Sequence, residues 1–370
     1  MNSSKNTFYN PPFSRVYIEE EALASPAAAD LLRAAAKYSG GQQPIVIRRY
    51  MDVFGRAHQS FAVQKNSPAL ILAVKHGSFL YPGADVCQSF GNSHFYYTSF
   101  AMNCPFHCEY CYLQGMYPSA NLVLFVNLDD YFAEIERLLA QHPVYLCISY
   151  DTDLLALERM TGFVRRYLEF AAGREGLVTE LRTKSAFPVR QLIFPPATAD
   201  GGSDGAVCPG GAASLSAAIP RTILAYTLSP ESVVSRYEHG TAPLSARLSA
   251  LRAAAQAGFP VRLCFDPLLR IPDFDRIYGE FIDEVHSALD DVPILDVGIG
   301  VFRISDSYLK QMRKSLPGSA LLQYPFENTG HVCHYGARGE KMIAFVKQRL
   351  SGWIPEEKIY TPQLPEGRGA

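Results

Sequence analysis

Strand-like and helix-like segments alternate along the chain after Phe95, and this alternation limits the folds that are available to it. Short apolar or aromatic runs are followed by longer runs with helical spacing of their apolar residues. The expected strands are Phe95–Phe100, Val123–Val126, Val144–Ser149, Leu177–Arg182, Arg221–Thr227, Val261–Phe265 and Ile294–Ile299. The expected helices are Leu128–Ala140, Leu154–Ala172, Ser185–Ile193, Leu244–Ala257, Phe274–Leu289 and Ser305–Lys314. About six such repeats predict an α/β fold built as a partial (β/α)6 barrel, with reactive groups at the C-terminal ends of the strands.

Three regions are expected along the chain. Residues 1–90 form an N-terminal appendage, residues 91–320 form the partial barrel, and residues 321–370 form a C-terminal cap with one more helix at Glu340–Leu350. Gly, Ala, Pro and Asp crowd into residues 195–213, which predicts a flexible surface insertion within the barrel region.

The composition excludes several classes of protein. A formal net charge of −2 over 370 residues excludes a protein that grips nucleic acid by a strong overall field, although a local basic groove stays possible. No apolar run approaches the roughly 20 residues that span a bilayer, and the first residues lack the apolar stretch of a secretory signal. We therefore expect a cytoplasmic protein with no membrane partner, in which 8 cysteines are not a disulfide framework.

Three of the cysteines fall within eight residues, directly after the first aromatic strand. The segment Cys104-Pro-Phe-His-Cys108-Glu-Tyr-Cys111 has the spacing C-x3-C-x2-C, with Tyr110 just before the last cysteine. Three thiolates can hold three irons of a [4Fe–4S] cubane and leave the fourth iron open, whereas ordinary electron-transfer clusters use four cysteines. An open iron is what chelation by S-adenosylmethionine (SAM) requires. The spacing therefore predicts a radical-SAM enzyme whose cluster is held by Cys104, Cys108 and Cys111.

Three other interpretations of the cysteines are weaker. A structural zinc site has four ligands in paired patterns, and neither His94 nor His107 completes one of the common spacings. A thioredoxin-like pair needs only C-x2-C and leaves Cys104 unexplained. A chance group of buried cysteines does not explain the position directly after a strand, at the start of an α/β repeat. The cluster is favoured over all three.

Further runs of sequence indicate which reaction a radical-SAM enzyme of this kind catalyses. They are the Cys111-Tyr-Leu-Gln-Gly115 continuation of the cysteine motif, Asp52–Phe54, Ser67-Pro68, Leu80–Gly83, Cys87–Asn92, Tyr150–Asp153, Arg182–Lys184, Ser229–Glu231 and Phe302–Ser305. With these runs the chain resembles the spore photoproduct lyase family, in the form associated with clostridial spore formers. The likeness spans most of the chain and breaks near Asp200.

The resemblance implies a DNA repair lyase that converts 5-thyminyl-5,6-dihydrothymine, the spore photoproduct, back into two thymines. In such an enzyme the reduced cluster cleaves SAM, and the 5′-deoxyadenosyl radical takes the C6 hydrogen of the lesion. The bridge between the thymines then fragments, and a protein hydrogen donor quenches the thymine radical. The hard chemistry belongs to the cofactors, while the protein orients them and excludes water.

The resemblance also suggests which side chains take part in the radical path. The family's donor cysteine follows the second barrel strand, and Tyr150 stands at that position here. Cys87 and Cys147 are therefore the candidate donors, with Cys87 slightly favoured, since Cys147 lies inside a strand where a buried small hydrophobe is the alternative. Tyr110 and Tyr112 resemble family tyrosines that could relay a hydrogen back towards SAM.

The same resemblance places SAM across the strand ends. Lys184, with Ser149 or Thr152, would contact its amino or carboxylate group, and Ser229 would face its ribose. Without the resemblance, a lysine at a strand end such as Lys184 could equally be a solvated surface charge.

Damaged DNA is the implied partner, together with an electron donor such as a ferredoxin or flavodoxin, in the cytoplasm of the spore core. Candidate DNA contacts are Lys310, Arg313 and Lys314 on one helix face, and Tyr335 and Arg338 in the cap; plain solvated surface is the alternative for the charges. The lesion would be flipped into a pocket at the barrel mouth.

Two other functions stay open: a radical-SAM enzyme of the same fold with another nucleic-acid or peptide substrate, and a non-catalytic zinc or iron–sulfur protein that binds nucleic acid.

Overall fold

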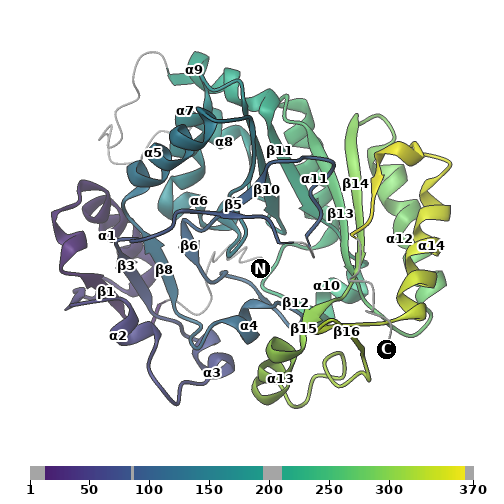
Figure 1. The fold of residues 1–370 in the computed structure, drawn as a ribbon, viewed down its shortest axis with the longest axis horizontal. Coiled ribbons are helices and arrows are strands. Elements are labelled where there is room, and N and C mark those ends of the chain that lie inside the picture. The colour runs from purple at the N-terminus through teal and green to yellow at the C-terminus, as the bar shows by residue number, and fades with distance from the viewer. Residues whose placement is uncertain (1–12, 85–86, 195–210, 363–370) are drawn as a thin grey trace, which may run out of the picture.

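The computed structural model describes residues 13–84, 87–194 and 211–362, and of residues 211–214 only the backbone. Most of the expected insertion at 195–213 lies outside the described residues. Two sheets organise the described chain, and helices cover them on the outside (Figure 1).

An eight-stranded sheet makes up the larger part of the molecule. Its order is β18-β14-β13-β11-β10-β9-β5-β4, and only β4 runs antiparallel to its neighbour. The strands are β4 (Leu80–Pro82), β5 (Phe95–Thr98), β9 (Val144–Cys147), β10 (Leu177–Thr183), β11 (Thr222–Thr227), β13 (Val261–Leu268), β14 (Ile294–Val301) and β18 (Ile359–Tyr360). The six parallel strands from β5 to β14, joined by helices, confirm the predicted α/β class with its partial (β/α)6 barrel.

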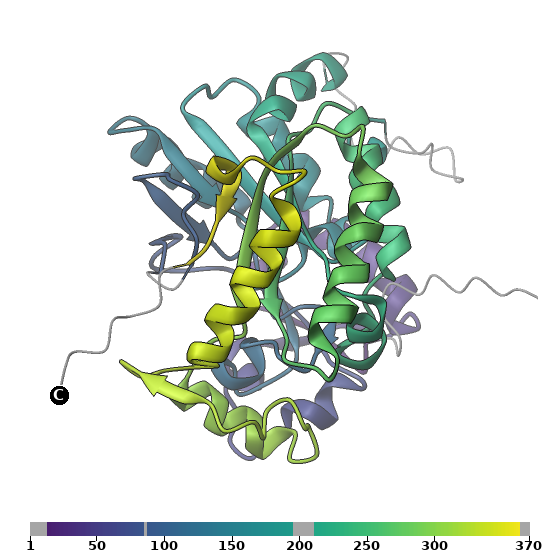
Figure 2. The same cartoon turned by 90° about the vertical axis from the view of Figure 1, so that its right-hand side faces the viewer.

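The helices that follow these strands lie outside the sheet, and Figure 2 shows α12 and α14 side by side on one flank. The longer ones are α5 (Leu128–Leu139), α6 (Leu154–Thr161), α7 (Phe163–Ala171), α9 (Gly211–Ala218), α11 (Leu244–Gln256), α12 (Phe274–Leu289), α13 (Asp306–Ser315) and α14 (Ala337–Leu350). Shorter helical turns are α4 (Leu113–Met116), α8 (Arg190–Ile193), α10 (Glu231–Tyr237), η2 (Ile219–Arg221) and η3 (Glu356–Lys358).

A second sheet is built mainly from the N-terminal region. Its order is β2-β1-β3-β8-β6, and only the β6–β8 pair is antiparallel. The strands are β1 (Val16–Glu19), β2 (Ile45–Ile47), β3 (Leu70–Ala73), β6 (Ala101–Met102) and β8 (Leu122–Phe125), with η1 (Glu21–Ala24), α1 (Pro26–Ser39), α2 (Met51–Phe54) and α3 (Phe61–Lys65) around them. The strand expected at Val123–Val126 therefore pairs with β3 and not with the barrel strands.

Local chemistry explains where the observed helices differ from the expected ones. The helix expected at Leu154–Ala172 is broken at Gly162, which has a left-handed φ of 62° and ends α6. Of the helix expected at Ser185–Ile193, only the last turn is helical in the structure, at Arg190–Ile193. Asn127 stands at the N-cap position of α5, but its side chain makes no capping bond and instead joins the backbone of Lys75, accepting from its N at 2.8 Å and donating to its carbonyl oxygen at 3.0 Å.

A buried arginine joins four barrel strands from inside. Arg262 of β13 is 1% exposed and donates to Glu180 on β10, to Asp296 on β14 and to the hydroxyl of Tyr145 on β9. The two carboxylates neutralise a charge that would otherwise be costly inside the protein. The network therefore fixes the relative positions of β9, β10, β13 and β14.

The glycine that ends the CYLQG run sits where α4 touches α13. A Cβ added to Gly115 would lie 2.5 Å from the carbonyl oxygen and 2.6 Å from the Cα of Tyr308. We expect Gly115→Ala to lower the free energy of unfolding by about 1–3 kcal/mol, because backbone must move to make room. Chemical denaturation measures this change. Gly173→Ala is the matched control, since its Cβ would meet nothing within 4 Å; equal stability of the two variants would contradict the close approach of α4 and α13.

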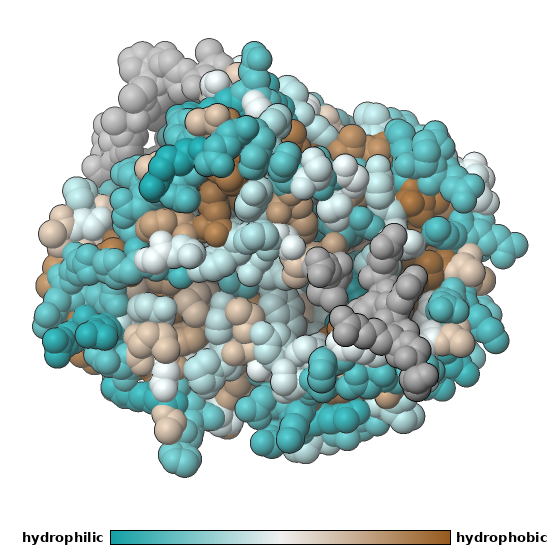
Figure 3. Space-filling model, in the orientation of Figure 1, coloured by the Kyte–Doolittle hydropathy of each residue, from teal (hydrophilic) through white to brown (hydrophobic). Residues whose placement is uncertain are grey.

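The surface carries no broad apolar area on the face shown in Figure 3, where hydrophobic residues form separate groups among hydrophilic ones. The large apolar side chains that are exposed come from several elements: Leu23, Ile45, Val46, Met51, Val63, Met116, Phe194 and Leu295. Among the described helices, none combines the length and the apolar character needed to cross a membrane.

Candidate functional site

The cysteine motif lies in a loop that both sheets help to hold. The loop leaves β6 of the N-terminal sheet and returns to β8 of the same sheet, and these two strands pair with each other. Within the loop, β7 (His107–Cys108) pairs antiparallel with β12 (Glu238–His239), which follows barrel strand β11 and α10. The motif is thereby placed at the C-terminal ends of the barrel strands, where the fold was expected to carry its reactive groups.

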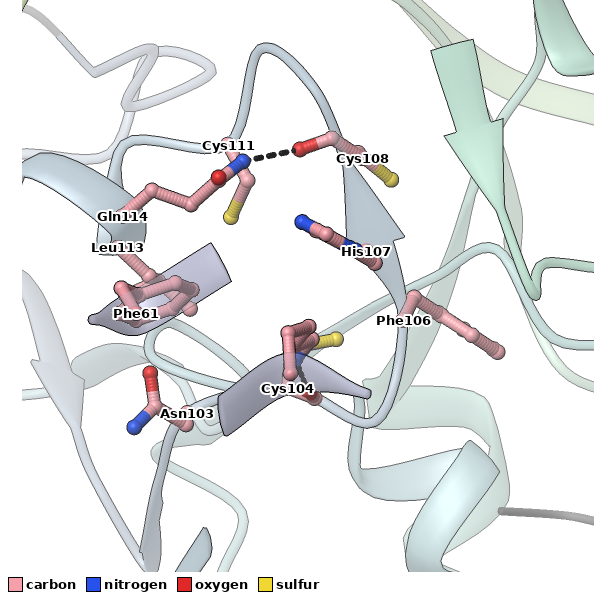
Figure 4. A pocket seen from close by; sticks show the side chains of 10 residues that line it. Phe61, Asn103, Cys104, Phe106, His107, Cys108, Cys111, Leu113 and Gln114 are labelled. Atoms are coloured by element: carbon pink, nitrogen blue, oxygen red, sulfur yellow. Dashed lines mark hydrogen bonds between the residues drawn. The ribbon is translucent and has the colours of Figure 1, made fainter. Parts of the chain in front are cut away.

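The three cysteines line one pocket, in which His107 lies between them and Gln114 comes in from the side beside Cys111 (Figure 4). The Gln114 amide donates to the carbonyl oxygen of Cys108 at 2.7 Å. Burial raises the pKa of all three thiols, that of Cys104 to about 12 with a further contribution from Asp153. Burial lowers the pKa of His107 to about 4, with the positive charge of Lys65 acting in the same direction.

One observation in the pocket fits an iron–sulfur cluster. Three buried polar atoms among its lining residues have no hydrogen-bond partner, namely Asn103 Oδ1, His107 Nε2 and Gln114 Oε1. Such atoms are rare in a folded interior and mark a place where a group is expected.

A carboxylate ties the ends of β9 and β10 together beside this pocket. Asp153 caps α6 by accepting from Ala156 N at 3.0 Å, and it also accepts from Thr183 Oγ1 at 2.9 Å and from Lys184 N at 2.7 Å. Burial raises the pKa of Asp153, although these hydrogen bonds act against the rise. The backbone of Lys184 is thus fixed, while its Nζ lies 5.5 Å from the centroid of the Tyr110 ring.

A fully buried ion pair supports the opposite side of the cysteine loop. Arg247 and Glu238 have side chains with 0% exposure and meet at 2.5 Å. The hydroxyls of Tyr110 and Ser229 both donate to Glu238 Oε1, the latter at 3.0 Å. Although burial acts to raise the pKa of Glu238, the charges of Lys184 and Arg247 hold it below its usual range. Tyr110, expected as a relay, is therefore held by a carboxylate.

The residues expected to contact SAM stand at the ends of three consecutive strands. Ser149 and Thr152 follow β9, Lys184 follows β10 and Ser229 follows β11. Ser149 Oγ accepts from Arg182 N at 2.6 Å, and Ser229 is engaged with Glu238. Thr152 Oγ1 is buried without a partner, as is the Oγ1 of Thr227 at the end of β11. The fold brings this set together, and the unpartnered hydroxyls suit a polar ligand across the strand ends.

Cys87 lies against a cluster of tyrosines at the same end of the barrel. Its Sγ is 3.4 Å from the hydroxyl of Tyr150, whose ring stacks on Tyr97 at a centroid distance of 4.0 Å. The hydroxyl of Tyr112 donates to the Tyr150 carbonyl oxygen at 2.7 Å and to Asp151 at 3.2 Å. Tyr150 thus contacts Cys87 through its hydroxyl and Tyr112 through its backbone carbonyl oxygen.

Cys147 lies nearby on β9 but is more enclosed. It is 5% exposed, and burial raises the pKa of its thiol to about 12, with the negative charge of Glu180 adding to the rise. Cys147 pairs with Tyr97 across β9 and β5, and the Tyr97 ring stacks on Tyr150, which contacts Cys87, so both candidate donors lie in the same part of the barrel.

The expected DNA contacts differ in their accessibility. Lys310 and Lys314 on α13 and Arg338 on α14 are exposed. The Arg313 guanidinium instead donates to the carbonyl oxygens of Leu322 and Tyr324, at 2.7 and 2.9 Å, and so holds the segment after α13. Tyr335 is 3% exposed, and its hydroxyl accepts from Arg270 N at 3.3 Å.

A small three-stranded sheet lies between α13 and α14. Its strands are β15 (Ile304–Ser305), β17 (Val332–His334) and β16 (Glu327–Thr329). Figure 2 shows this sheet beside α13, below the start of α14. The three exposed basic side chains, Lys310, Lys314 and Arg338, therefore come from one corner of the molecule.

Several residues of the site were not foreseen from the sequence. Asp153 belongs to the Tyr150–Asp153 run, but no role was expected for it. Glu238 and Arg247 lie in none of the runs singled out above, and the roles of all three depend on contacts between distant segments. Lys65 lies in the N-terminal region yet reaches the cysteine pocket. No local sequence pattern distinguishes a buried lysine in a short helix from an exposed one, so the position of Lys65 could not be predicted from the sequence.

Comparison with known proteins connects this architecture with one enzyme. No family model matches the chain. It is 24% identical to the spore photoproduct lyase of Geobacillus sp. (strain Y412MC61) over 205 residues, which are 53% of this chain and 52% of that protein. It is 22% identical to the spore photoproduct lyase of Bacillus subtilis (strain 168) over 199 residues, 52% of either chain. The matched segment thus spans about half the length of these curated relatives.

Solved structures of spore photoproduct lyase share the fold over nearly the whole chain. A cysteine-to-serine variant superposes with a TM-score of 0.75 at 19% identity, covering 95% of this chain and 99% of that one. A complex with dinucleoside spore photoproduct gives 0.74 at 19% identity, with the same coverage. A third structure also gives 0.74, at 20% identity and again over 95% and 99% of the two chains. It has one cysteine changed to alanine and one serine changed to cysteine, and holds AdoMet and the dinucleoside lesion. The resemblance inferred from the sequence motifs is confirmed.

Proposed function

We propose that this protein is a radical-SAM DNA repair lyase that splits the spore photoproduct into two thymines. The observation that carries the proposal is the position of the C-x3-C-x2-C loop. It lies at the C-terminal ends of the parallel strands, beside the polar strand ends of β9, β10 and β11 and next to the Cys87–Tyr150 contact. The similarity to spore photoproduct lyases, one of them with AdoMet and the lesion bound, supports the choice of substrate.

Cys104, Cys108 and Cys111 would hold the [4Fe–4S] cluster, and SAM would bind its open iron. Together these cofactors would supply a 5′-deoxyadenosyl radical that abstracts hydrogen from the lesion. The chain's own contribution is to fix the polar groups around them. Lys184 and Thr152 would meet the methionine end of SAM, and the Glu238–Arg247 pair supports the loop from behind.

Cys87 is the proposed hydrogen donor to the thymine radical. It is less enclosed than Cys147, and its thiol contacts the Tyr150 hydroxyl, so a hydrogen lost from sulfur can be replaced from an adjacent O–H group. The Tyr112 hydroxyl donates to the backbone carbonyl oxygen of Tyr150, and the two rings lie 5.9 Å apart between centroids, so Tyr112 would continue the path towards SAM from beside the Tyr150 ring. Tyr110 is held by Glu238 and would support the cluster side of the site.

The same proposal also covers the DNA contacts, the electron donor and the cellular compartment. The lesion would be flipped out of damaged DNA, at a cost of a few kcal/mol for unstacking. Lys310, Lys314 and Arg338 would contact its phosphates. A ferredoxin or flavodoxin would deliver the electron, and the enzyme would act in the cytoplasm of the spore core.

The test is turnover of a synthetic dinucleoside spore photoproduct by the anaerobically reconstituted protein with SAM and a chemical reductant. We expect two thymidine molecules as the product for each lesion that is split. SAM cleavage without any thymine product would overturn the lyase assignment and favour another nucleic-acid or peptide substrate. Absence of both the cluster and SAM cleavage would favour a non-catalytic metal protein.

A further inference from the structure

A lysine from the N-terminal region lies buried beside the three cluster cysteines. Lys65 is 9% exposed, and its Nζ donates to the backbone carbonyl of Cys104. Burial lowers the pKa of Lys65, while the neighbouring thiols of Cys104, Cys111 and Cys108 act against this change. Within the described ranges, no ion pair joins Lys65 to a carboxylate. Lys184, the other lysine near the pocket, interacts with Asp153 and Glu238 as well.

The short helix that carries Lys65 is anchored to the far end of the cysteine loop. Ser60 caps α3 by accepting from Val63 N at 3.4 Å. Gln64 Oε1 accepts from Ser119 Oγ at 3.2 Å and from Ala120 N at 3.0 Å. The position of Lys65 over the pocket is therefore fixed by neighbours on both sides, unlike that of a surface lysine.

A buried ammonium group without an anion nearby is costly. A cubane on three thiolates supplies that anion, since it carries a net negative charge that grows by one when the cluster is reduced. A fixed positive charge in a low-dielectric site stabilises the more negative, reduced form. Net charge near the cluster is one of the factors that set its reduction potential.

We propose that Lys65 is the counter-charge of the cluster and raises its reduction potential, so that the electron needed for SAM cleavage can be accepted. The proposal rests on the cluster assigned above but not on the identity of the substrate. Lys65 would act only through the cluster, and the proposal assigns it no contact with the substrate.

The experiment is a redox titration of the reconstituted, full-length protein, with the reduced cluster followed by electron paramagnetic resonance. Lys65→Gln keeps a donor for the Cys104 carbonyl but removes the charge. At the potential where half of the wild-type clusters are reduced, we expect the ratio of reduced to oxidised cluster to be about tenfold lower, a shift of roughly 59 mV for one electron. Lys65→Arg should restore the wild-type value, and Lys37→Gln, an exposed lysine of α1, should not change it.

The outcomes separate charge from packing. An unchanged midpoint in Lys65→Gln with full iron content would overturn the proposal. Loss of the cluster in Lys65→Gln but not in Lys65→Arg would support it, since the charge would then be required to hold the cluster. Loss in both variants would assign Lys65 to packing and overturn it. A wild-type protein that holds the cluster and cleaves SAM but leaves the lesion intact would refute the lyase assignment and leave this test valid.

Discussion

Replacing Cys108 with alanine should abolish SAM cleavage and remove most of the bound iron. Cys108 is the middle cysteine of the motif and lies on β7, where its backbone pairs with Glu238. With only two of the three cysteines left, the motif can no longer bind three corners of a cubane. Iron and sulfide analysis, together with the yield of 5′-deoxyadenosine after reduction, measure the loss.

The matched control is Cys333→Ala. Cys333 is equally buried, at 7% exposed, but lies on β17 away from the cysteine loop. It should keep its iron and its SAM cleavage. If Cys108→Ala retained both, the cluster assignment would be wrong; if Cys333→Ala lost both, the effect would reflect a general loss of folding.

Replacing Cys87 with alanine should uncouple SAM cleavage from repair. The S–H bond of a thiol is weak, so Cys87 can quench a carbon radical that its tyrosine neighbours quench less readily. Without it, we expect the repaired thymine yield to fall by about 10²-fold or more, in the range that loss of a positioned hydrogen-transfer group typically costs. The intermediate should be diverted to other products while 5′-deoxyadenosine still forms. Chromatography of the nucleoside products with mass detection measures both.

Cys147→Ala is the comparison that assigns the donor. Both thiols lie in the same part of the barrel, but only Cys87 contacts the Tyr150 hydroxyl. Diversion of products in Cys147→Ala and not in Cys87→Ala would reverse the assignment. Normal repair in both variants would make Tyr150 itself the candidate donor.

Features that are encoded locally could be predicted from the sequence. The spacing of Cys104, Cys108 and Cys111 is a property of eight consecutive residues, and each barrel strand and helix shows its own periodicity. The resemblance to the lyase family named Ser149, Lys184 and Ser229, and the strand pattern agrees with their proximity, because the C-terminal ends of parallel strands share one edge.

What the sequence did not reveal depends on pairing between distant segments. The strand after the cysteine loop has the same apolar character as a barrel strand, yet β8 pairs with β3. Lys65 is separated from Cys104 by 39 positions, and its contact to that residue follows from the packing of α3. The contact of Cys87 with Tyr150 spans 63 positions and likewise has no local pattern.

The most direct test of the central claim uses spore photoproduct labelled with deuterium at C6. We predict that the reconstituted enzyme releases two thymines with no deuterium on the methyl group formed from the bridge, and that the deuterium abstracted from C6 appears in 5′-deoxyadenosine, where mass spectrometry detects it. Formation of 5′-deoxyadenosine without deuterium, with the lesion left intact, would contradict the assignment.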